Sequence, residues 1–205
     1  MTSSDHSSVI NRFPIQQPPP IIGEPTYESI NILVQSLYAN AASIPSDLGG
    51  SAHGHLGLIM SPTLYAMLTT TPFTIPDDPG QTPDYPTGRL TTEERTMYKD
   101  EHHEELHHYK LQRDVEAAQK SQLIGAAQQS YWEVKRHKHT GFLTSTTRDI
   151  IQHLLDTYGR ITPTALAENL KRFQQPIDPT ISLELYYKAL EDAMQYAYDG
   201  GSPLS

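Results

Sequence analysis

The stretch HHEELHH, from His102 to His108, has the residue types and spacing of a helical zinc-binding motif. In the pattern H-E-x-x-H, His103 and His107 lie one helical turn apart, so that both imidazoles can reach one metal ion. Glu104 then occupies the position of a general base. Together, these three residues suggest zinc-dependent hydrolysis.

Catalytic zinc also needs a third protein ligand and a cleft that excludes water. The metzincin continuation of the motif is absent, because its glycine and third histidine positions hold Lys110 and Arg113. A downstream acid such as Glu133 stays open as a third ligand. The charged flanks, Lys99–His102 and His108–Lys110, are typical of a solvated helix face. We therefore predict incidental metal affinity here, with no catalytic or metal site, and keep a zinc-dependent hydrolase as the less favoured alternative.

The remaining histidines suggest structural roles. His53 and His55 lie in a glycine-studded loop, residues 46–60, where a hydrogen bond to nearby backbone is a sufficient role. His153 lies beside an apolar helical stripe and is expected to be a partly exposed structural residue. The loop lacks G-x-G-x-x-G and a Lys-Ser/Thr ending, so its glycines indicate close packing rather than a phosphate site. We predict no cofactor, no catalytic residue and no small-molecule substrate.

Composition excludes several other classes of protein. The 205 residues include no cysteine, which rules out disulfides, thiolate zinc fingers and a cysteine nucleophile. No apolar run approaches the roughly 18 residues that a membrane helix needs, and the N-terminus lacks a secretory signal pattern. We therefore expect a cytoplasmic protein with no membrane partner.

The net charge of −9 disfavours direct binding to nucleic acid. The one basic run, residues 135–139, is interpreted as a solvated helix end, where cations complement the helix dipole. RNA is therefore expected to be contacted only indirectly, or through regions downstream of this sequence.

Four segments follow from the distribution of proline, glycine and apolar residues. Residues 1–25 are predicted to be a disordered or extended Pro/Ser-rich tail with a polyproline stretch at 18–20. Residues 26–70 hold two helices, capped by Thr26 and Ser61, and the glycine loop. Residues 71–90 form a Pro-rich connector, because their five prolines exclude a helix or a central strand.

Residues 91–203 are predicted to form a helical domain. A capping box at Thr91 starts a long helix that Gly125 kinks or splits, and Thr146 or Ser145 caps the next helix. Further helices are expected from Thr162–Pro163 and from Asp178–Pro179. No convincing strand is present, so the predicted fold class is all-α, a bundle of short amphipathic helices.

A last cap-then-proline pair, Ser202–Pro203, predicts a helix start just before the sequence stops. From this pair we expect the sequence to be a fragment or remnant of a longer polypeptide.

The order of motifs resembles a known family. The segments GGSAHGHLGLIMSPTLYAML, VEAAQKSQLIGAAQQSYW and GFLTSTTRDIIQHLLDTYGRITPTAL are similar to the capsid region of Gag-like polyproteins from LTR retrotransposons, apparently of the copia type. In the last segment, Thr147, Ile151 and Leu155 precede Tyr158–Gly159 and Ile161–Thr162, as in the helix and turn of that family. The resemblance covers roughly residues 30–203.

The resemblance implies a structural protein rather than an enzyme. Gag capsid proteins self-associate into a shell around the RNA of their element, so the implied partner of this chain is itself. A second possibility is a Gag-derived adaptor, in which the Pro-rich N-terminus docks a partner that recognises polyproline.

Overall fold

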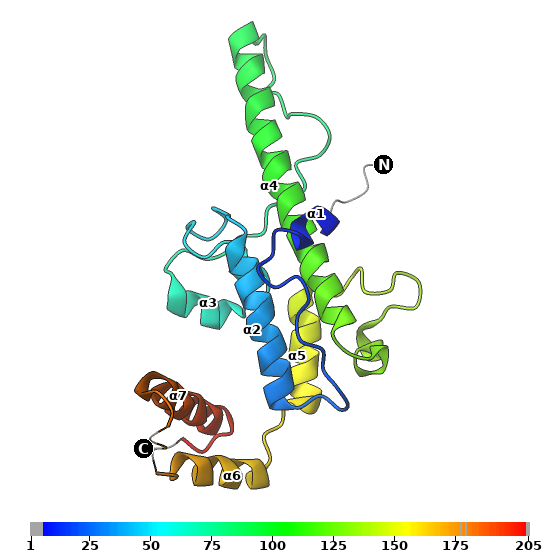
Figure 1. Cartoon of the computed structure of the whole chain (residues 1–205). Coiled ribbons are helices and arrows are strands. Elements are labelled where there is room, and N and C mark those ends of the chain that lie inside the picture. The colour runs from blue at the N-terminus through cyan, green and yellow to red at the C-terminus, as the bar shows by residue number, and fades with distance from the viewer. Residues whose placement is uncertain (1–5, 177, 179, 204–205) are drawn as a thin grey trace.

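A computed structural model of the chain describes residues 6–176, 178 and 180–203. Over these residues the chain forms seven α-helices, three short 3-10 helices and no strand, so the predicted all-α fold class is confirmed (Figure 1). The α-helices are α1 (His6–Ile10), α2 (Tyr27–Ser43), α3 (Pro62–Leu68), α4 (Thr92–Gly125), α5 (Thr147–Tyr158), α6 (Pro163–Phe173) and α7 (Leu183–Asp199). The 3-10 helices are η1 (Leu56–Leu58), η2 (Gln129–Tyr131) and η3 (Glu133–Lys135).

Five helices begin where local sequence predicts. In each, a hydroxyl oxygen accepts a hydrogen bond from the backbone N–H three residues later, at 3.1 to 3.3 Å. This satisfies one of the N–H groups that a helix start leaves without an intrahelical acceptor. The capping residues are Thr26, Ser61, Thr91, Thr146 and Thr162.

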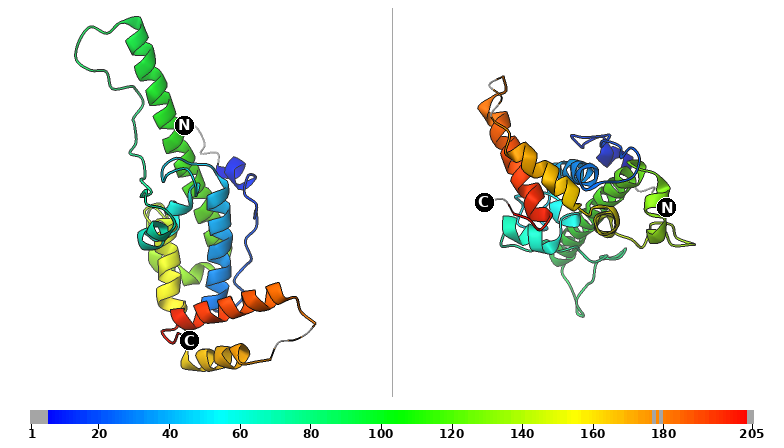
Figure 2. Two further views of the ribbon diagram at one scale, coloured as in Figure 1. Left: turned by 90° about the vertical axis from the view of Figure 1, so that its left-hand side faces the viewer. Right: turned by 90° about the horizontal axis from the view of Figure 1, so that it is seen from below.

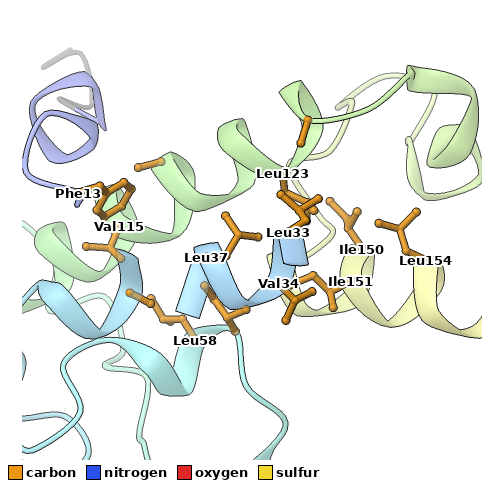
Figure 3. Close-up of a cluster of buried hydrophobic side chains, with 14 of the residues drawn as sticks. Phe13, Leu33, Val34, Leu37, Leu58, Val115, Leu123, Ile150, Ile151 and Leu154 are labelled. Carbon is orange, nitrogen blue, oxygen red and sulfur yellow. The ribbon is translucent and has the colours of Figure 1, made fainter. Parts of the chain in front are cut away.

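The hydrophobic core lies where α2, the C-terminal half of α4 and α5 meet (Figure 3). Each helix contributes an apolar stripe, as helical spacing predicts for α2 and α5. Trp132, in the turn after α4, is also fully buried. Burying one aliphatic side chain of the core stabilises the fold by about 1.5–3 kcal/mol relative to leaving it exposed. The central side chains are Leu33, Val34, Leu37, Val115, Leu123, Ile150, Ile151 and Leu154.

The N-terminal segment differs from the disordered tail expected from its composition. Residues 1–5 lie outside the described part of the chain, but Val9, Phe13 and Ile21 are buried in the core. Residues 11–25 follow α1 and form no helix or strand; they are here called the N-terminal strap. Val9, Phe13 and Ile21 are isolated among polar residues and prolines, so the sequence shows no apolar periodicity here. Their burial depends on contacts with α2 and α4.

A buried polar cluster fixes the strap to the helices. The Asn40 side chain accepts from the Ile15 N–H (2.9 Å) and donates to the Ile15 carbonyl oxygen (2.7 Å). Asn40 also donates to the Gln122 Oε1 at 2.9 Å, and Gln122 donates to the carbonyl oxygens of Ile15 and Gln16, both at 3.0 Å. Backbone groups of an irregular segment are thus satisfied inside the molecule, as burial requires.

Helix α4 is the long helix that the capping box at Thr91 predicts, and it stands partly alone. Its N-terminal half extends beyond the other helices, accompanied by the Pro-rich stretch 71–90, which forms no helix and no strand (Figures 1 and 2). Tyr85 of that stretch packs edge-to-face on Tyr98, with ring centroids 6.2 Å apart. The helix ends at Gly125, so Gly125 terminates rather than kinks it, and Val134 lies exposed in the following turns.

Helices α6 and α7 pack against each other across the lower end of the bundle (Figure 2). Helix α7 begins at Leu183 rather than at the predicted Asp178–Pro179, of which Pro179 lies outside the described residues. Ser182 is the cap, accepting from the Leu185 N–H at 3.3 Å. Asp178 instead accepts from the Thr180 N–H (2.8 Å) and hydroxyl (2.7 Å), which closes a turn ahead of the helix.

Candidate functional site

The H-E-x-x-H residues lie on the outer half of α4, where His103, Glu104 and His107 are all exposed. The predicted one-turn spacing of the two histidines is present. Glu133 lies on η3, beyond the C-terminal end of α4, and eighteen residues of helix from His107 to Gly125 span about 27 Å. Glu133 is therefore not brought to the three H-E-x-x-H residues.

Glu133 has partners of its own. Its carboxylate accepts from the Arg136 guanidinium at 3.1 Å and from the Gln129 amide at 2.8 Å. Among the residues that the structure describes, no group of three or more His, Asp or Glu side chains is placed to hold a metal ion. No zinc-dependent mechanism is assembled from these residues.

The structure does bring three histidines from two distant segments to one cavity of about 450 Å³, here called the histidine cleft. Sequence reasoning treated these residues separately, and nothing in their spacing signals the contact. The cleft lies between the loop after α2 and the middle of α4, beneath the strap. Its lining consists of Arg12, Pro45, Ser46, Asp47, Leu48, Ser51, His55, His107, His108 and Leu111.

His55 is the buried member of the cleft. Its Nδ1 lies 3.0 Å from the Ile44 carbonyl oxygen, which can only accept, so Nδ1 carries the proton and Nε2 is left as an acceptor. Burial lowers the pKa of His55 below 6.5, and the nearby Arg12 acts in the same direction, against the hydrogen bond to Ile44. The ring is therefore a neutral imidazole at neutral pH.

The mouth of the cleft is weakly charged. His108 Nε2 lies 3.9 Å from Asp47 Oδ1, and both side chains are largely exposed. Such a pair requires a protonated histidine and contributes well under about 1 kcal/mol at this exposure. Ser46 uses its hydroxyl to accept from the Leu48 N–H at 3.2 Å, which shapes the loop. This hydrogen bond positions the loop backbone. The cleft also contains the neutral imidazole of His55 and the guanidinium of Arg12.

The glycine loop is close-packed, as its composition predicts. Gly54 has φ +51°, and a Cβ atom there would lie 2.5 Å from the Ile44 carbonyl oxygen. At Gly57 a Cβ atom would lie 2.3 Å from the Phe73 side chain. The Arg148 guanidinium of α5 donates to the Gly57 carbonyl oxygen. The glycines thus allow loop, connector and α5 to approach each other closely.

The other predicted residues have structural partners. His53 packs edge-to-face on Tyr65, with ring centroids 6.2 Å apart. His153 Nε2 lies 3.1 Å from the Tyr131 carbonyl oxygen, and the ring is half-buried, in agreement with its predicted role. The basic run 135–139 is mostly exposed. It begins at Lys135, the last residue of the 3-10 helix η3, and continues into a turn closed by His137 and Gly141.

Large apolar side chains are exposed on α3, α6 and α7. On α3, Leu64, Met67 and Leu68 are uncovered while Tyr65 is buried. On α6 and α7, the described residues with buried side chains are Asn169 and Ala197. Helical spacing predicts that Leu170 of α6 points inward, but it is 40% exposed, and Leu185 and Met194 of α7 are exposed as well. Amphipathic spacing identifies a face that packs but does not say against what.

No protein-family model, curated protein or solved structure matches the chain. The described residues form an all-α protein with a central core of α2, α4 and α5. The N-terminal half of α4 projects from this core, and α6 and α7 form a helical hairpin. Within the described ranges, each helix is too short or too polar to cross a lipid bilayer.

Proposed function

We propose that this chain is a Gag-type, capsid-like structural protein that self-associates through helical surfaces to form a particle shell. The observation that carries the proposal is the set of exposed large apolar side chains on α3 and α7. Exposed apolar surface, where it gathers, marks protein–protein contact. The ordered motifs between Gly49 and Thr162 support the same class.

In the proposed shell, this chain makes no direct contact with RNA. With a net charge of −9 the chain repels a phosphate backbone, so in this proposal RNA is contacted only indirectly. The proposed location is the cytoplasm.

The self-association is tested with the untagged chain across a wide concentration range. Light scattering coupled to size-exclusion chromatography is expected to give a mass that rises with concentration, and electron microscopy is expected to show particles. A monomer at every concentration, with no particles, would contradict the proposal.

A Gag-derived adaptor is the second candidate, because Pro19 and Pro20 are exposed on the strap. Deleting residues 1–25 would also remove Val9, Phe13 and Ile21 from the core. The sharper test replaces the two exposed prolines by alanine and measures binding to domains that recognise polyproline. Equal binding before and after the substitution would exclude this candidate.

A further inference from the structure

The N-terminal strap lies on a surface that recognises main-chain groups. Asn40 of α2 bonds both to the N–H (2.9 Å) and to the carbonyl oxygen (2.7 Å) of Ile15, and Gln122 of α4 donates to the same carbonyl oxygen at 3.0 Å. Further along the strap, the Ile21 N–H donates to the carbonyl oxygen of Ala126, the C-cap of α4, at 2.7 Å. The surface around Asn40, Gln122 and Ala126 is here called the strap site. Because these bonds involve backbone atoms of the strap, they do not depend on which copy of the chain supplies it.

Apolar side chains add specificity to the backbone contacts. Val9 of α1 and Phe13 and Ile21 of the strap are buried in the core cluster that α2 and α4 share. Burial of these three side chains, at sequence separations of four and eight residues, selects this segment over an arbitrary extended peptide. A second copy of the chain carries the same side chains at the same spacing, so its strap fits the strap site by identity.

The strap joins α2 through an exposed reversal of the chain. It runs antiparallel to α2, because Ile15 lies beside Asn40 near the C-terminal end of that helix (Figure 1). Residues 22–24, which then turn the chain towards the start of α2, are exposed. Gly23 has φ +79° and open space around it, so the reversal uses a left-handed backbone that glycine adopts without strain.

A change of backbone at this reversal moves α1 and the strap as a unit. When Gly23 changes from left-handed to extended backbone, residues 22–25 span up to about 13 Å and the strap points away from its own strap site. Its hydrogen bonds and apolar contacts then form with the strap site of a second copy, whose strap returns the exchange. We propose that this chain forms a two-fold dimer by exchange of its N-terminal straps, with residues 22–25 as the hinge.

The balance between closed monomer and exchanged dimer depends on the hinge and on concentration. The strap makes the same contacts in both forms, so the contribution of these contacts cancels. The hinge differs, because in the closed form the Tyr131 hydroxyl donates to the Gly23 carbonyl oxygen at 2.9 Å. The proposal deepens the proposed function by naming one contact between copies, and it rests on the self-association proposed there.

Gly23→Val tests the hinge. A β-branched residue rarely adopts a left-handed backbone, and an exchanged dimer relieves the resulting strain at two hinges. The variant is therefore expected to lower the dimer dissociation constant at least about tenfold in analytical ultracentrifugation. Gly80→Val is the matched control, because Gly80 has φ +76° and open space around it but lies in the Pro-rich stretch. It is expected to leave the dissociation constant unchanged.

A mixing experiment tests the exchange itself. Phe13→Ser damages the strap and leaves the strap site intact, whereas Asn40→Ala damages the strap site and leaves the strap intact. Each change is expected to release the strap in its own chain. In a mixture, the intact strap of the Asn40→Ala chain finds an intact strap site on the Phe13→Ser chain. Sedimentation is therefore expected to give a higher mass for the mixture than for either variant alone at the same total concentration. Circular dichroism checks that both variants keep their helices.

Three outcomes separate this proposal from the proposed function. A tighter dimer in Gly23→Val but not in Gly80→Val, together with heterodimers in the mixture, supports strap exchange. Association of the wild type that Gly23→Val does not change, without heterodimers in the mixture, would overturn strap exchange and leave the capsid-like function standing. A wild type and a Gly23→Val variant that are both monomeric at all concentrations would overturn both.

Discussion

His55 shows how burial assigns a role to one residue. Its ring lies inside the molecule and donates from Nδ1 to the Ile44 carbonyl oxygen. Exposed histidines on α4, such as His103, have neither that burial nor a neighbouring set of ligands. The same residue type therefore supports the fold at one position and lies in solvent at the other.

Protonation of His55 is expected to destabilise the fold. Burial is the main cause that lowers the pKa of His55 below 6.5. As the pH falls, the unfolded chain therefore binds a proton at His55 at a higher pH than the folded chain does. The free energy of unfolding should therefore be constant with respect to His55 above about pH 6.5 and decrease as the pH falls below it. Urea midpoints between about pH 5 and pH 7.5 measure this dependence.

His55→Asn keeps a side-chain donor and removes the titration, so its pH dependence should be flatter than that of the wild type. His103→Asn, on the exposed half of α4, should keep the wild-type slope. Equal slopes for the wild type and His55→Asn would show that His55 does not couple to folding.

Zinc is expected to be far below one ion per chain after purification without an affinity tag. His103→Ala should change the free energy of unfolding by no more than about 0.5 kcal/mol, as for a surface side chain. Metal analysis and denaturant unfolding measure the two quantities. The zinc-dependent hydrolase would be supported if the wild type held one zinc ion per chain and His103→Ala lost both the zinc and stability.

Gly54 is predicted to be the most sensitive glycine of the loop. Gly54→Ala combines a left-handed backbone (φ +51°) with a Cβ atom 2.5 Å from the Ile44 carbonyl oxygen. Gly80 has a similar φ of +76° but open space around it, so Gly80→Ala measures backbone strain alone. We expect losses of about 1 kcal/mol at Gly80 and about 3 kcal/mol or more at Gly54. Equal losses in urea unfolding would contradict the close packing of the loop.

At the scale of elements, the strap is the least independent segment. Its Ile15 and Ile21 backbone groups bond to Asn40, Gln122 and Ala126, which belong to α2 and the end of α4. The strap is therefore held by those helices rather than by regular structure of its own.

Asn40→Ala should release the strap without unfolding the helices. The substitution leaves the Ile15 N–H and the Gln122 Oε1 without a partner, at a cost of about 2–3 kcal/mol, while the Ile15 carbonyl oxygen keeps its hydrogen bond from Gln122. Limited proteolysis is expected to cut residues 14–22 faster than in the wild type. Ser43→Ala, which removes a hydrogen bond to the Asn40 carbonyl oxygen near the surface, is the control. Unchanged proteolysis in Asn40→Ala would mean that apolar contacts alone hold the strap.

Element starts could be predicted because capping is local. Thr26, Thr91 and Thr146 bond within four residues of themselves, so sequence alone contains both partners. The start of α7 was predicted too early, because both Asp178 and Ser182 carry cap signatures and the Asp178 side chain closes a turn instead. Burial of the strap, the histidine cleft and the exposure of α7 depend on contacts between distant segments, which no local pattern contains.

At the scale of the whole molecule, stability and interaction surfaces occupy different places. The core of α2, α4 and α5 lies in the middle, while the outer half of α4 and the α6–α7 pair extend to opposite ends (Figure 1). Exposed apolar side chains on α3 and α7 lie outside this core and support the proposed self-association. The histidine cleft lies between these regions and contributes to the fold.

The measurement that tests the central proposal most directly is the mass of the untagged chain as a function of concentration. We predict that the mass rises from that of the monomer towards larger particles as the concentration increases. A wild type that stays monomeric throughout would contradict self-association as the function of this chain.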